Sequence, residues 1–258
     1  MRLTGKGWTN SPVRLFEFIG SIGVLFVQTM RIMASGTFGG RETIRQMSLI
    51  GVNSLPIALV TTAFSSAVLS LQSSTLSVKF GMGNVVGGLV SLSVSREVAP
   101  VLTGVVVAAR VGSAIAAEVG TMKVTEQIDA LRTLAVHPVE YLVVPRFLAC
   151  LLMLPVLTMY ADAIGVVAGY IVAVYVGVSP GGYITSATSA SFIAVSDVTL
   201  GLAKTFVFGA IIALVGCQQG MQTRGGAAGV GRATTNAVVL SIILIYIANY
   251  FLSQLMFT

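Results

Sequence analysis

Few residues of this chain can do acid–base or nucleophilic chemistry. Its 258 residues include 15 Lys and Arg, nine Asp and Glu, and a single His. A catalytic site would need a nucleophile beside a base, or paired carboxylates in one cavity. The histidine, His137, lies in a polar loop, and no two carboxylates within one apolar run stand three or four residues apart. The sequence therefore predicts no catalytic residue, no metal site and no cofactor held by this chain itself.

The charges that do lie in apolar surroundings gather at the start of two apolar runs. Arg96 and Glu97 open one run, Asp197 opens another, and Lys204 follows seven residues later. Seven residues are roughly 10 Å of helix, so Asp197 and Lys204 share a face without touching. Charged groups at membrane depth face protein or a wet cavity. Two interpretations stay open: ion pairs between the helices (Glu97 with Lys204, or Arg96 with Asp197), or a polar rim for a lipid headgroup.

Arg110 lies deeper in the same run as Glu97. A guanidinium at that depth needs a partner. Glu118, further along the same run, and Asp162 in the following run are the candidates. We expect these three residues to form a structural network.

Composition indicates which elements must position these charges. Hydrophobic residues make up 55% of the chain and charged residues 9%, whereas a soluble domain carries roughly 25% charged residues. Long apolar runs occupy 46–78, 97–123, 147–178, 198–221 and 233–258. Each is long enough for a spanning helix of roughly 20 residues, and none alternates as barrel strands do. The sequence therefore predicts an all-α membrane protein.

The segment 15–33 is apolar but differs from these five runs, because it contains Glu17, Gln28 and Arg31. Charges at both ends and a polar residue near the middle favour a helix in the membrane interface over a sixth span. The expected architecture is an N-terminal interfacial helix within 1–45, followed by a five-span bundle in 46–258.

The basic residues predict the orientation of the chain. Eleven of the 15 Lys and Arg residues, Arg2, Lys6 and Arg14 among them, lie on one side if 1–45, 123–146 and 222–232 are cytoplasmic. The positive-inside rule favours this arrangement, which leaves the C-terminus outside. The net charge of +6 then reflects the membrane surface, and we expect no nucleic-acid partner.

Two of the runs carry small residues at every fourth position, which is typical of closely packed membrane helices. These stripes indicate a tight bundle rather than a substrate path. They consist of Gly104, Ala108, Gly112, Ala116 and Gly120, and of Ala161, Gly165, Gly169, Ala173 and Gly177.

The loop 123–138, between the second and third runs, contains a short amphipathic helix signal, with Thr125 as its expected cap and Pro138 beyond its end. Its apolar face needs something to receive it. The membrane or the protein's own spans would serve, and so would a cytoplasmic partner such as an ATPase. The expected apolar face holds Ile128, Leu131 and Leu134, and the polar face includes Glu126 and Asp129.

Several motifs, in order along the chain, resemble the MlaE-type permeases, the transmembrane subunits of ABC transporters that move phospholipids with MCE-domain partners. They are RLFEFIG near the start, SREVAP at 95–100, AARVGSAIAAEVGTM at 108–122, EQIDALRTLAVHP at 126–138 and GCQQGMQTRGGAAGVGRATT at 216–235. The resemblance covers nearly the whole chain, so we expect a single permease domain, 1–258. Because the sequence has no GxxxxGK[ST] phosphate loop, ATP and Mg would be bound by a partner.

The resemblance implies a homodimer in the inner membrane, with a cytoplasmic N-terminus and a periplasmic C-terminus. The implied partners are a phospholipid, an ABC ATPase similar to MlaF, a periplasmic MCE-domain protein similar to MlaD, and a STAS-domain protein similar to MlaB that acts through the ATPase. The implied function is ATP-driven phospholipid transport that maintains outer-membrane lipid asymmetry. The alternative is an ion-coupled secondary transporter that uses Asp162, Asp197 or Glu97.

The resemblance also implies roles for particular residues. The lipid headgroup would lie near Arg96, Glu97, Asp197 and Lys204. The acyl tails would contact Leu69, Leu76, Phe80 and Val98. A coupling helix between the second and third spans would contact the ATPase through Glu126, Gln127, Asp129, Leu131 and Arg132.

Overall fold

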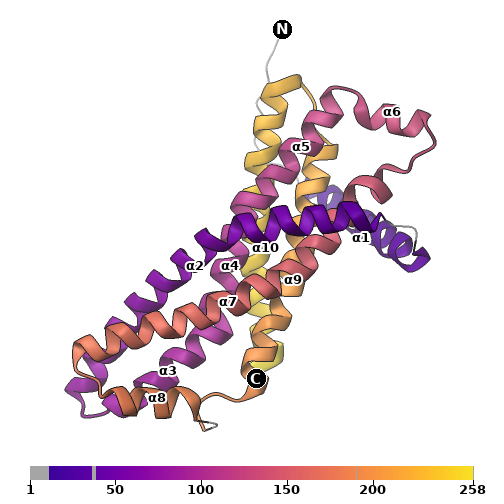
Figure 1. Ribbon diagram of the computed structural model, residues 1–258. Helices are drawn as coiled ribbons and strands as arrows, with labels where there is room; N and C mark the ends of the chain where they lie inside the picture. The colour runs from indigo at the N-terminus through magenta and orange to yellow at the C-terminus, as the bar shows by residue number, and fades with distance from the viewer. Residues whose placement is uncertain (1–11, 37–38, 190, 258) are drawn as a thin grey trace.

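The computed structural model describes residues 12–36, 39–189 and 191–257, with side chains from Glu17 onward. Arg2, Lys6 and the side chain of Arg14, used above for the orientation, lie outside this description. The described residues form helices and no strand (Figure 1). The helices are α1 (Pro12–Ser35), α2 (Gly40–Lys79), α3 (Val86–Ser93), α4 (Ala99–Val107), α5 (Ser113–Val124), α6 (Gln127–Thr133), α7 (Val144–Val176), α8 (Pro180–Thr188), α9 (Val195–Met221) and α10 (Gly226–Phe257).

Several of these helices join end to end. A 3₁₀ turn, η1 (Gly83–Val85), leads into α3, and two π-helical stretches, η2 (Val94–Val98) and η3 (Ala108–Gly112), link α3, α4 and α5 into one rod. A third π-helical stretch, η4 (Val139–Val143), leads into α7. Five helical segments, 40–79, 83–124, 139–176, 195–221 and 226–257, are long and apolar enough to cross a membrane. Each overlaps one of the five predicted runs, and together they confirm an all-α membrane protein. The second begins at residue 83 rather than 97, so Arg96 and Glu97 lie within the rod and not at its start.

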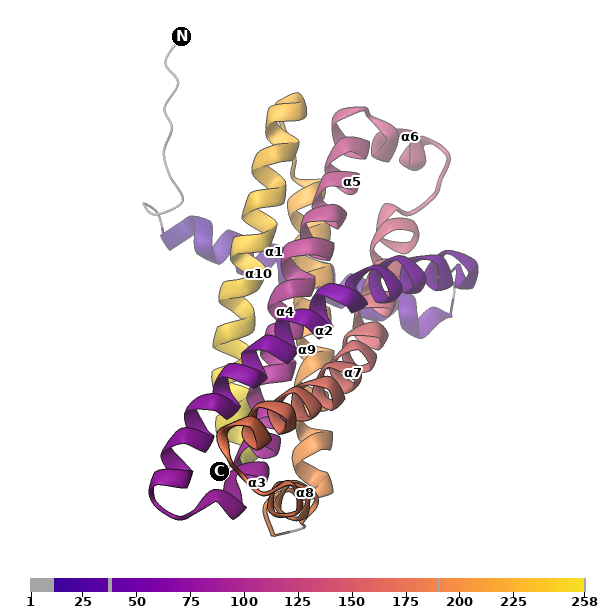
Figure 2. The ribbon, with the colours of Figure 1, turned by 60° about the vertical axis from the view of Figure 1, so that its left-hand side comes forward.

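The bundle has two distinct ends. Figures 1 and 2 place α6, the end of α5 and the start of α10 at one end, which we call the α6 end. The opposite end, the α8 end, carries α3, α8 and the end of α10. The sequence pattern predicts the short helix α6 but not α8.

Helix α1 also meets the length and composition of a span, with 17–35 as its candidate segment. In both views, however, it crosses the direction of α9 and α10 instead of following it (Figures 1 and 2). It docks through Leu25, which is 5% exposed within the main core, the buried apolar cluster that includes Phe147 and Ile212. It also docks through Ser21, whose Oγ accepts a 2.7 Å hydrogen bond from Gln218 Nε2. A helix lying across a bundle suits the membrane interface, so its geometry supports the interfacial prediction.

The longest close contact joins α2 and α7. Helix α2 buries a stripe of small and hydroxyl residues that faces the small residues of α7. At Gly165 a Cβ would lie 2.8 Å from Ser66 Oγ and 2.9 Å from Val94 Cγ1. Ser70 Oγ donates a 2.7 Å hydrogen bond to the carbonyl of Gly169. The stripe of α2 consists of Ser54, Ala58, Thr62, Ser66, Ser70 and Ser74.

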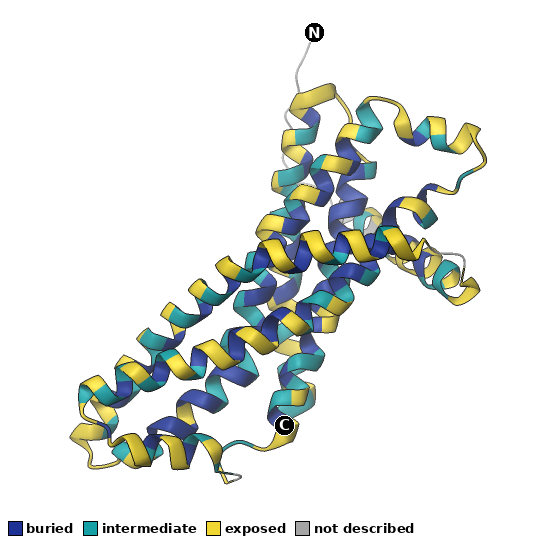
Figure 3. Ribbon diagram, in the orientation of Figure 1, coloured by how far each residue is buried: buried dark blue, intermediate teal, exposed yellow. Residues whose placement is uncertain are grey.

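The other predicted stripe faces α9 and α10. A Cβ on Gly104 would lie 3.1 Å from Phe208, and one on Gly112 would lie 3.5 Å from Ile212. The packing role of both stripes is thereby confirmed, except at Gly177. That residue ends α7 at φ +108°, a conformation that favours glycine, and a Cβ added there would meet no atom within 4 Å. Figure 3 shows buried residues along the inward faces and exposed ones along the outward faces of α2, α7 and α10.

Candidate functional site

The carboxylate of Glu97 is the centre of a polar cluster near the α8 end. Its Oε1 accepts hydrogen bonds of 2.7 Å from Lys204 Nζ and 2.7 Å from Ser253 Oγ. Its Oε2 accepts one of 2.7 Å from Asn249 Nδ2. Lys204 also donates to the backbone carbonyl of Arg96 at 2.9 Å and to Ser253 Oγ at 2.7 Å. The cluster thus ties together η2, α9 and α10, and the expected ion pair between Glu97 and Lys204 is confirmed.

A second ion pair lies beside the first. The Nη2 and Nε atoms of Arg96 donate to Asp197 Oδ1 at 2.6 and 3.0 Å. The other oxygen of Asp197 accepts a 2.8 Å hydrogen bond from the backbone N–H of Ala194, at the start of α9. A carboxylate there also meets the positive end of the helix dipole. Both ion pairs that the sequence suggested are therefore present together.

The π-helical stretch η2 explains how two adjacent residues serve two different pairs. A π turn contains more residues than an α turn and changes the direction of the side chains along the helix. Arg96 and Glu97 both lie within Val94–Val98. Arg96 contacts Asp197 at the start of α9, while Glu97 reaches Lys204 two turns deeper.

An aromatic ring closes one side of the cluster. The guanidinium carbon of Arg96 lies 4.4 Å from the ring centroid of Phe257, and Lys204 Nζ lies 4.7 Å from it. Cations over an aromatic face are stabilised by the ring quadrupole. Phe257 follows Asn249 and Ser253 at four-residue intervals on α10, so one face of this helix supplies three contacts to the cluster.

Burial divides these residues into two groups. Lys204 is fully enclosed and the side chain of Asp197 is 9% exposed, whereas the side chains of Glu97 and Arg96 keep 42% and 34% of their surface exposed. Lys204 and Asp197 therefore bind Glu97 and Arg96 from the buried side of the cluster. Only Glu97 and Arg96 present charge to a ligand.

Glu97 also lines a hollow of about 400 Å³. The remaining walls are mostly apolar, and Glu97 is the only charged residue among the described residues that line it. The lining comes from α2, η2, α4 and α10 and consists of Ser65, Glu97, Val98, Val101, Leu102, Tyr246 and Asn249. An apolar hollow with a single charged edge suits an amphiphile.

The residues expected to contact acyl tails are not all placed together. Val98 lines the hollow. Leu69 and Leu76 follow Ser65 by four and eleven residues, so they continue the same face of α2 toward the α8 end. Leu69 packs partly against a smaller core, the buried cluster that includes Val90 and Tyr183. Leu76 and Phe80 are 59% and 75% exposed. This row therefore extends the hollow along α2 as an open apolar surface.

Helix α6 occupies the predicted loop, but its start differs from the prediction. Thr125 does not cap it; its Oγ1 instead donates to the carbonyl of Thr121 at 2.8 Å. Glu126 stands at the cap position in the left-handed conformation, φ +62°, without a side-chain cap. The prediction was wrong because the chain turns sharply after α5, and residue 126 makes the turn. Ala135, just past the helix, is also left-handed at φ +57°.

The apolar side chains of α6 pack mainly against the protein itself. Ile128 is 1% exposed and Leu131 packs against the main core, whereas Leu134 is 72% exposed. On the polar side, Glu126 and Gln127 are exposed. The three residues therefore do not share one exposed face. Ile128 and Leu131 pack against the protein, and Leu134 remains exposed to contact a partner.

Two ion pairs hold Asp129 within α6. Its carboxylate accepts from Lys123 Nζ at 2.9 Å and from Arg132 Nη1 at 3.0 Å. The hydrogen bond from Lys123, together with the positive charges of both partners, lowers the pKa of Asp129 below its ordinary value. An opposite charge close by favours the ionised carboxylate. Asp129 thus stabilises the helix and its link to α5.

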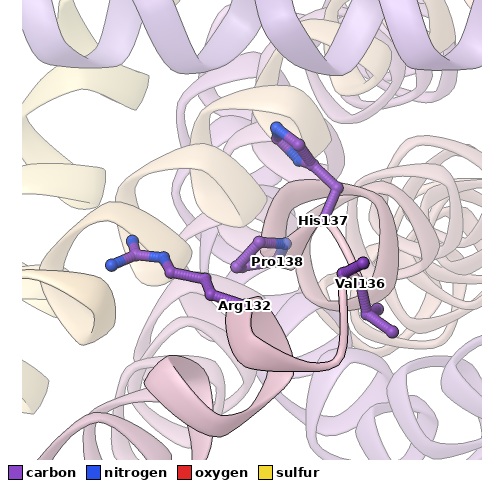
Figure 4. Close-up of a pocket in the computed structure, with 5 residues that line it drawn as sticks. Arg132, Val136, His137 and Pro138 are labelled. Carbon is purple, nitrogen blue, oxygen red and sulfur yellow. The ribbon is translucent and has the colours of Figure 1, made fainter.

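A hollow of about 310 Å³ lies beside α6, lined by Arg132, Ala135, Val136, His137 and Pro138. Figure 4 shows the side chains of Arg132 and His137 pointing away from each other. The sequence gives no reason to expect a ligand at His137. The hollow lies at the surface of the α6 end, beside the last turn of α6 and the residues that follow it.

The predicted network of Arg110, Glu118 and Asp162 is wrong. Glu118 accepts a 2.9 Å hydrogen bond from Arg146 Nη2 instead. Asp162 is buried, and neither of its carboxylate oxygens has a hydrogen-bond partner among the described residues. Arg110 is exposed. The tertiary fold places Arg146, at the start of α7, within hydrogen-bond distance of Glu118, whereas Arg110, in the same rod as Glu118, does not reach it.

Sequence reasoning missed the contribution of α10. Asn249, Ser253 and Phe257 lie in the uncharged run 233–258, where nothing marked them as partners of buried charges. The available signal was the four-residue spacing of Asn249 and Ser253, which places two polar side chains on one face of a mostly apolar helix. Such a pair needs a polar neighbour in a membrane.

The long apolar helices and the charged cluster between them define a multi-pass membrane protein with a polar site at one end. Residues 43–255 match the family Permease MlaE, and the chain belongs to this family. It is 43% identical over 256 residues to a protein of Synechocystis sp. described as "Probable ABC transporter permease protein", which covers 99% of this chain and 97% of the relative. A protein of Rickettsia prowazekii with the same description is 48% identical, over 95% of this chain and 98% of the relative.

A plant protein is also similar. Protein TRIGALACTOSYLDIACYLGLYCEROL 1, chloroplastic, of Arabidopsis thaliana is 38% identical over 239 residues, which cover 92% of this chain and 67% of the relative. Together these similarities show an ABC transporter permease. Membership of that class implies an ATPase partner.

Proposed function

We propose that this chain is the membrane-spanning subunit of an ATP-driven phospholipid transporter of the inner membrane. It moves lipid between that membrane and a periplasmic MCE-domain partner similar to MlaD, and so maintains outer-membrane lipid asymmetry. The observation that carries the proposal is the apolar hollow of about 400 Å³, in which Glu97 is the single charged residue among the described lining residues. Apolar walls suit acyl tails and the charged edge suits a headgroup.

The cluster residues have different roles in this proposal. Glu97 and Arg96 keep exposed surface and contact the headgroup. Lys204 and Asp197 bind those two residues from behind and hold them in position, so they act on the lipid indirectly. The acyl tails lie against Val98 and continue along the α2 row of Leu69, Leu76 and Phe80.

The α6 end faces the cytoplasm in this proposal, with the N-terminus, and the C-terminus lies on the periplasmic side. Helix α6 is the coupling helix, and an ATPase similar to MlaF, which binds ATP and Mg, docks on it through Glu126, Gln127, Arg132 and Leu134. A STAS-domain protein similar to MlaB acts through that ATPase. Asp129 and Leu131 hold α6 in place, as their contacts with Lys123 and the core indicate. Two copies of the chain form the permease.

Site-specific photo-crosslinking tests the lipid site. A photoreactive amino acid replaces Leu102, which lines the hollow, or Tyr175, which is 90% exposed on α7. After purification in detergent, phospholipid should be cross-linked at position 102 and not at position 175. Glu97→Lys should lower that yield, whereas Glu42→Lys, a charge reversal at the other end of α2, should not. Equal yields at both positions would contradict a lipid site in the hollow.

Complex isolation tests the coupling helix. Glu126→Lys and Leu134→Ser alter exposed positions at the edges of α6 and spare the contacts that hold it. Both should reduce ATPase association and lipid-stimulated ATP hydrolysis, while membrane insertion stays normal. Leu255→Ser, at an 81% exposed position on α10, is the matched control. Full ATPase association in both α6 variants would refute the docking role.

An ion-coupled secondary transporter is the second candidate, and one observation favours it. Asp162 is a buried carboxyl in a spanning helix whose oxygens lack hydrogen-bond partners among the described residues, and such groups are used as proton or ion sites. Lipid movement by the purified chain alone, driven by a proton gradient and abolished by Asp162→Asn, would support this candidate. Dependence on the ATPase and ATP would exclude it.

A further inference from the structure

Arg110 carries a charge at membrane depth that the cluster around Glu97 does not use. It lies at the middle of the π-helical stretch η3, as Arg96 lies at the middle of η2. Among the described residues it has no ion-pair or hydrogen-bond partner for its guanidinium, while Arg96 has Asp197. π-Helical turns within α-helices are frequent at functional sites. The rod 83–124 thus places an arginine in each of its two π turns, and one of the two is unpaired.

A hollow of about 170 Å³ lies next to Arg110, between α2 and the rod. Its polar lining side chains are Arg110, Asn53, Gln46 and Glu118. Two of these are already engaged: Gln46 Nε2 donates to Glu42 at 3.0 Å, and Glu118 accepts from Arg146. Arg110 and Asn53 are therefore the groups with donors to offer.

The remaining lining is apolar and consists of Leu49, Ile50, Val111, Ala114 and Ile115. A free anion gains nothing from such walls, whereas the glycerol and upper acyl chain of a lipid do. The planar fork of an arginine matches the oxygens of a phosphate. The Glu118 carboxylate on the rim does not repel that phosphate strongly, because Arg146 neutralises it.

We infer that the Arg110 hollow is a second lipid site, which binds the phosphate of a phospholipid headgroup. The inference rests on the proposed lipid transport for the identity of the ligand. Arg110 follows Arg96 by 14 residues, about 21 Å along a helix. The hydrocarbon core of a bilayer is about 30 Å thick, so the two sites lie toward opposite leaflets. A lipid that crosses between the leaflets would then have one headgroup position at each end of the same rod.

Native mass spectrometry of the complex in nanodiscs tests this site. The nanodiscs contain phosphatidylglycerol in one arm, and diacylglycerol of the same chains mixed with it in the other. Arg110→Gln should weaken retention of one phosphatidylglycerol by about tenfold, the loss of one charge-assisted interaction, and should not change retention of diacylglycerol. Arg110→Lys should restore part of the binding, because the charge returns without the fork. Arg41→Gln, at an exposed arginine near the start of α2, is the control.

Three outcomes would overturn the inference. Unchanged lipid retention in Arg110→Gln would show that no lipid binds there. Displacement of the retained lipid by inorganic phosphate alone would indicate a free anion site. A disulfide between two Arg110→Cys chains would show that a second copy covers the hollow. If lipid is also absent from the photo-crosslinking site at position 102, the proposed transport function fails; if lipid is present there, only the second site fails.

Discussion

The amino group of Lys204 lies 2.7 Å from Oε1 of Glu97 and is fully enclosed, while the carboxylate it binds keeps 42% of its side-chain surface exposed. A buried charge is tolerated when a partner and further hydrogen bonds satisfy it. Lys204 has three such acceptors within 2.9 Å: Glu97, Ser253 and the Arg96 carbonyl. Lys204 therefore holds the Glu97 carboxylate in position from inside the bundle, and Glu97 exposes part of its side chain.

Removing the lysine alone should destabilise the protein. Lys204→Met leaves Glu97 without its opposite charge, and breaking a buried pair costs about 3–5 kcal/mol. We expect the lower end of that range, because the exposed side of Glu97 can recruit water. Thermal unfolding in detergent measures the loss.

The double variant separates charge from shape. Lys204→Met combined with Glu97→Gln removes both charges, so most of the lost stability should return. If the double variant is as unstable as the sum of the single ones, the ion pair is not what holds these helices together.

Gly165 should tolerate no added carbon. Gly165→Ala places a Cβ 2.8 Å from Ser66 Oγ and 2.9 Å from Val94 Cγ1, and overpacking costs typically 1–3 kcal/mol. Gly23→Ala on α1 meets no atom within 4 Å and should be neutral or stabilising, since alanine favours helix. Comparison of the two melting temperatures checks this, and equal values would argue against close packing of α2 on α7.

Phe257 should matter more than its position near the end of α10 suggests. Phe257→Ala removes the ring that lies over Arg96 and Lys204, a contact worth about 0.5–2 kcal/mol. Phe251→Ala, at a residue 65% exposed, is the matched control. The first variant should lower the melting temperature and lipid retention together. Identical behaviour of the two variants would leave the ring without a role in the cluster.

Asp129 should keep α6 ordered over a wide pH range. Its folded-state pKa is lowered, chiefly by the hydrogen bond from Lys123, so its stabilisation is present above the unfolded pKa and disappears as the pH falls through the lowered value. Amide exchange in α6, corrected for intrinsic rates, should therefore not change between about pH 7 and pH 5 on account of this group.

Asp129→Asn should raise α6 exchange at every pH in that window, because both ion pairs are lost. Glu126→Gln, at a residue with no ion pair among the described residues, is its control. A rise in exchange on acidification in the native protein alone would contradict a lowered pKa.

The sequence by itself determined that the protein lies in a membrane, that its spans are helices, and that small residues recur along two of them. With 9% charged residues the chain cannot cover a surface in water, and five uncharged or nearly uncharged runs can only be helices in a membrane. The positions of α2, α7, α9 and α10 followed from those runs, whereas the rod 83–124 begins 14 residues before its run. The motifs at 95–100 and 126–138 indicated the family, and the two ion pairs were among the expected alternatives.

Tertiary structure decided which polar groups meet. Glu118 binds Arg146 rather than Arg110, because the fold brings the first turn of α7 within reach of Glu118 on α5, a contact that no local pattern records. Asn249, Ser253 and Phe257 join the Glu97 cluster only because α10 returns along the rod 83–124. Local periodicity specifies which residues share a face of one helix, whereas the register and tilt between helices decide which faces touch. The packing of the bundle therefore decides that Lys204 is enclosed by acceptors, whereas the Arg110 guanidinium has no partner among the described residues.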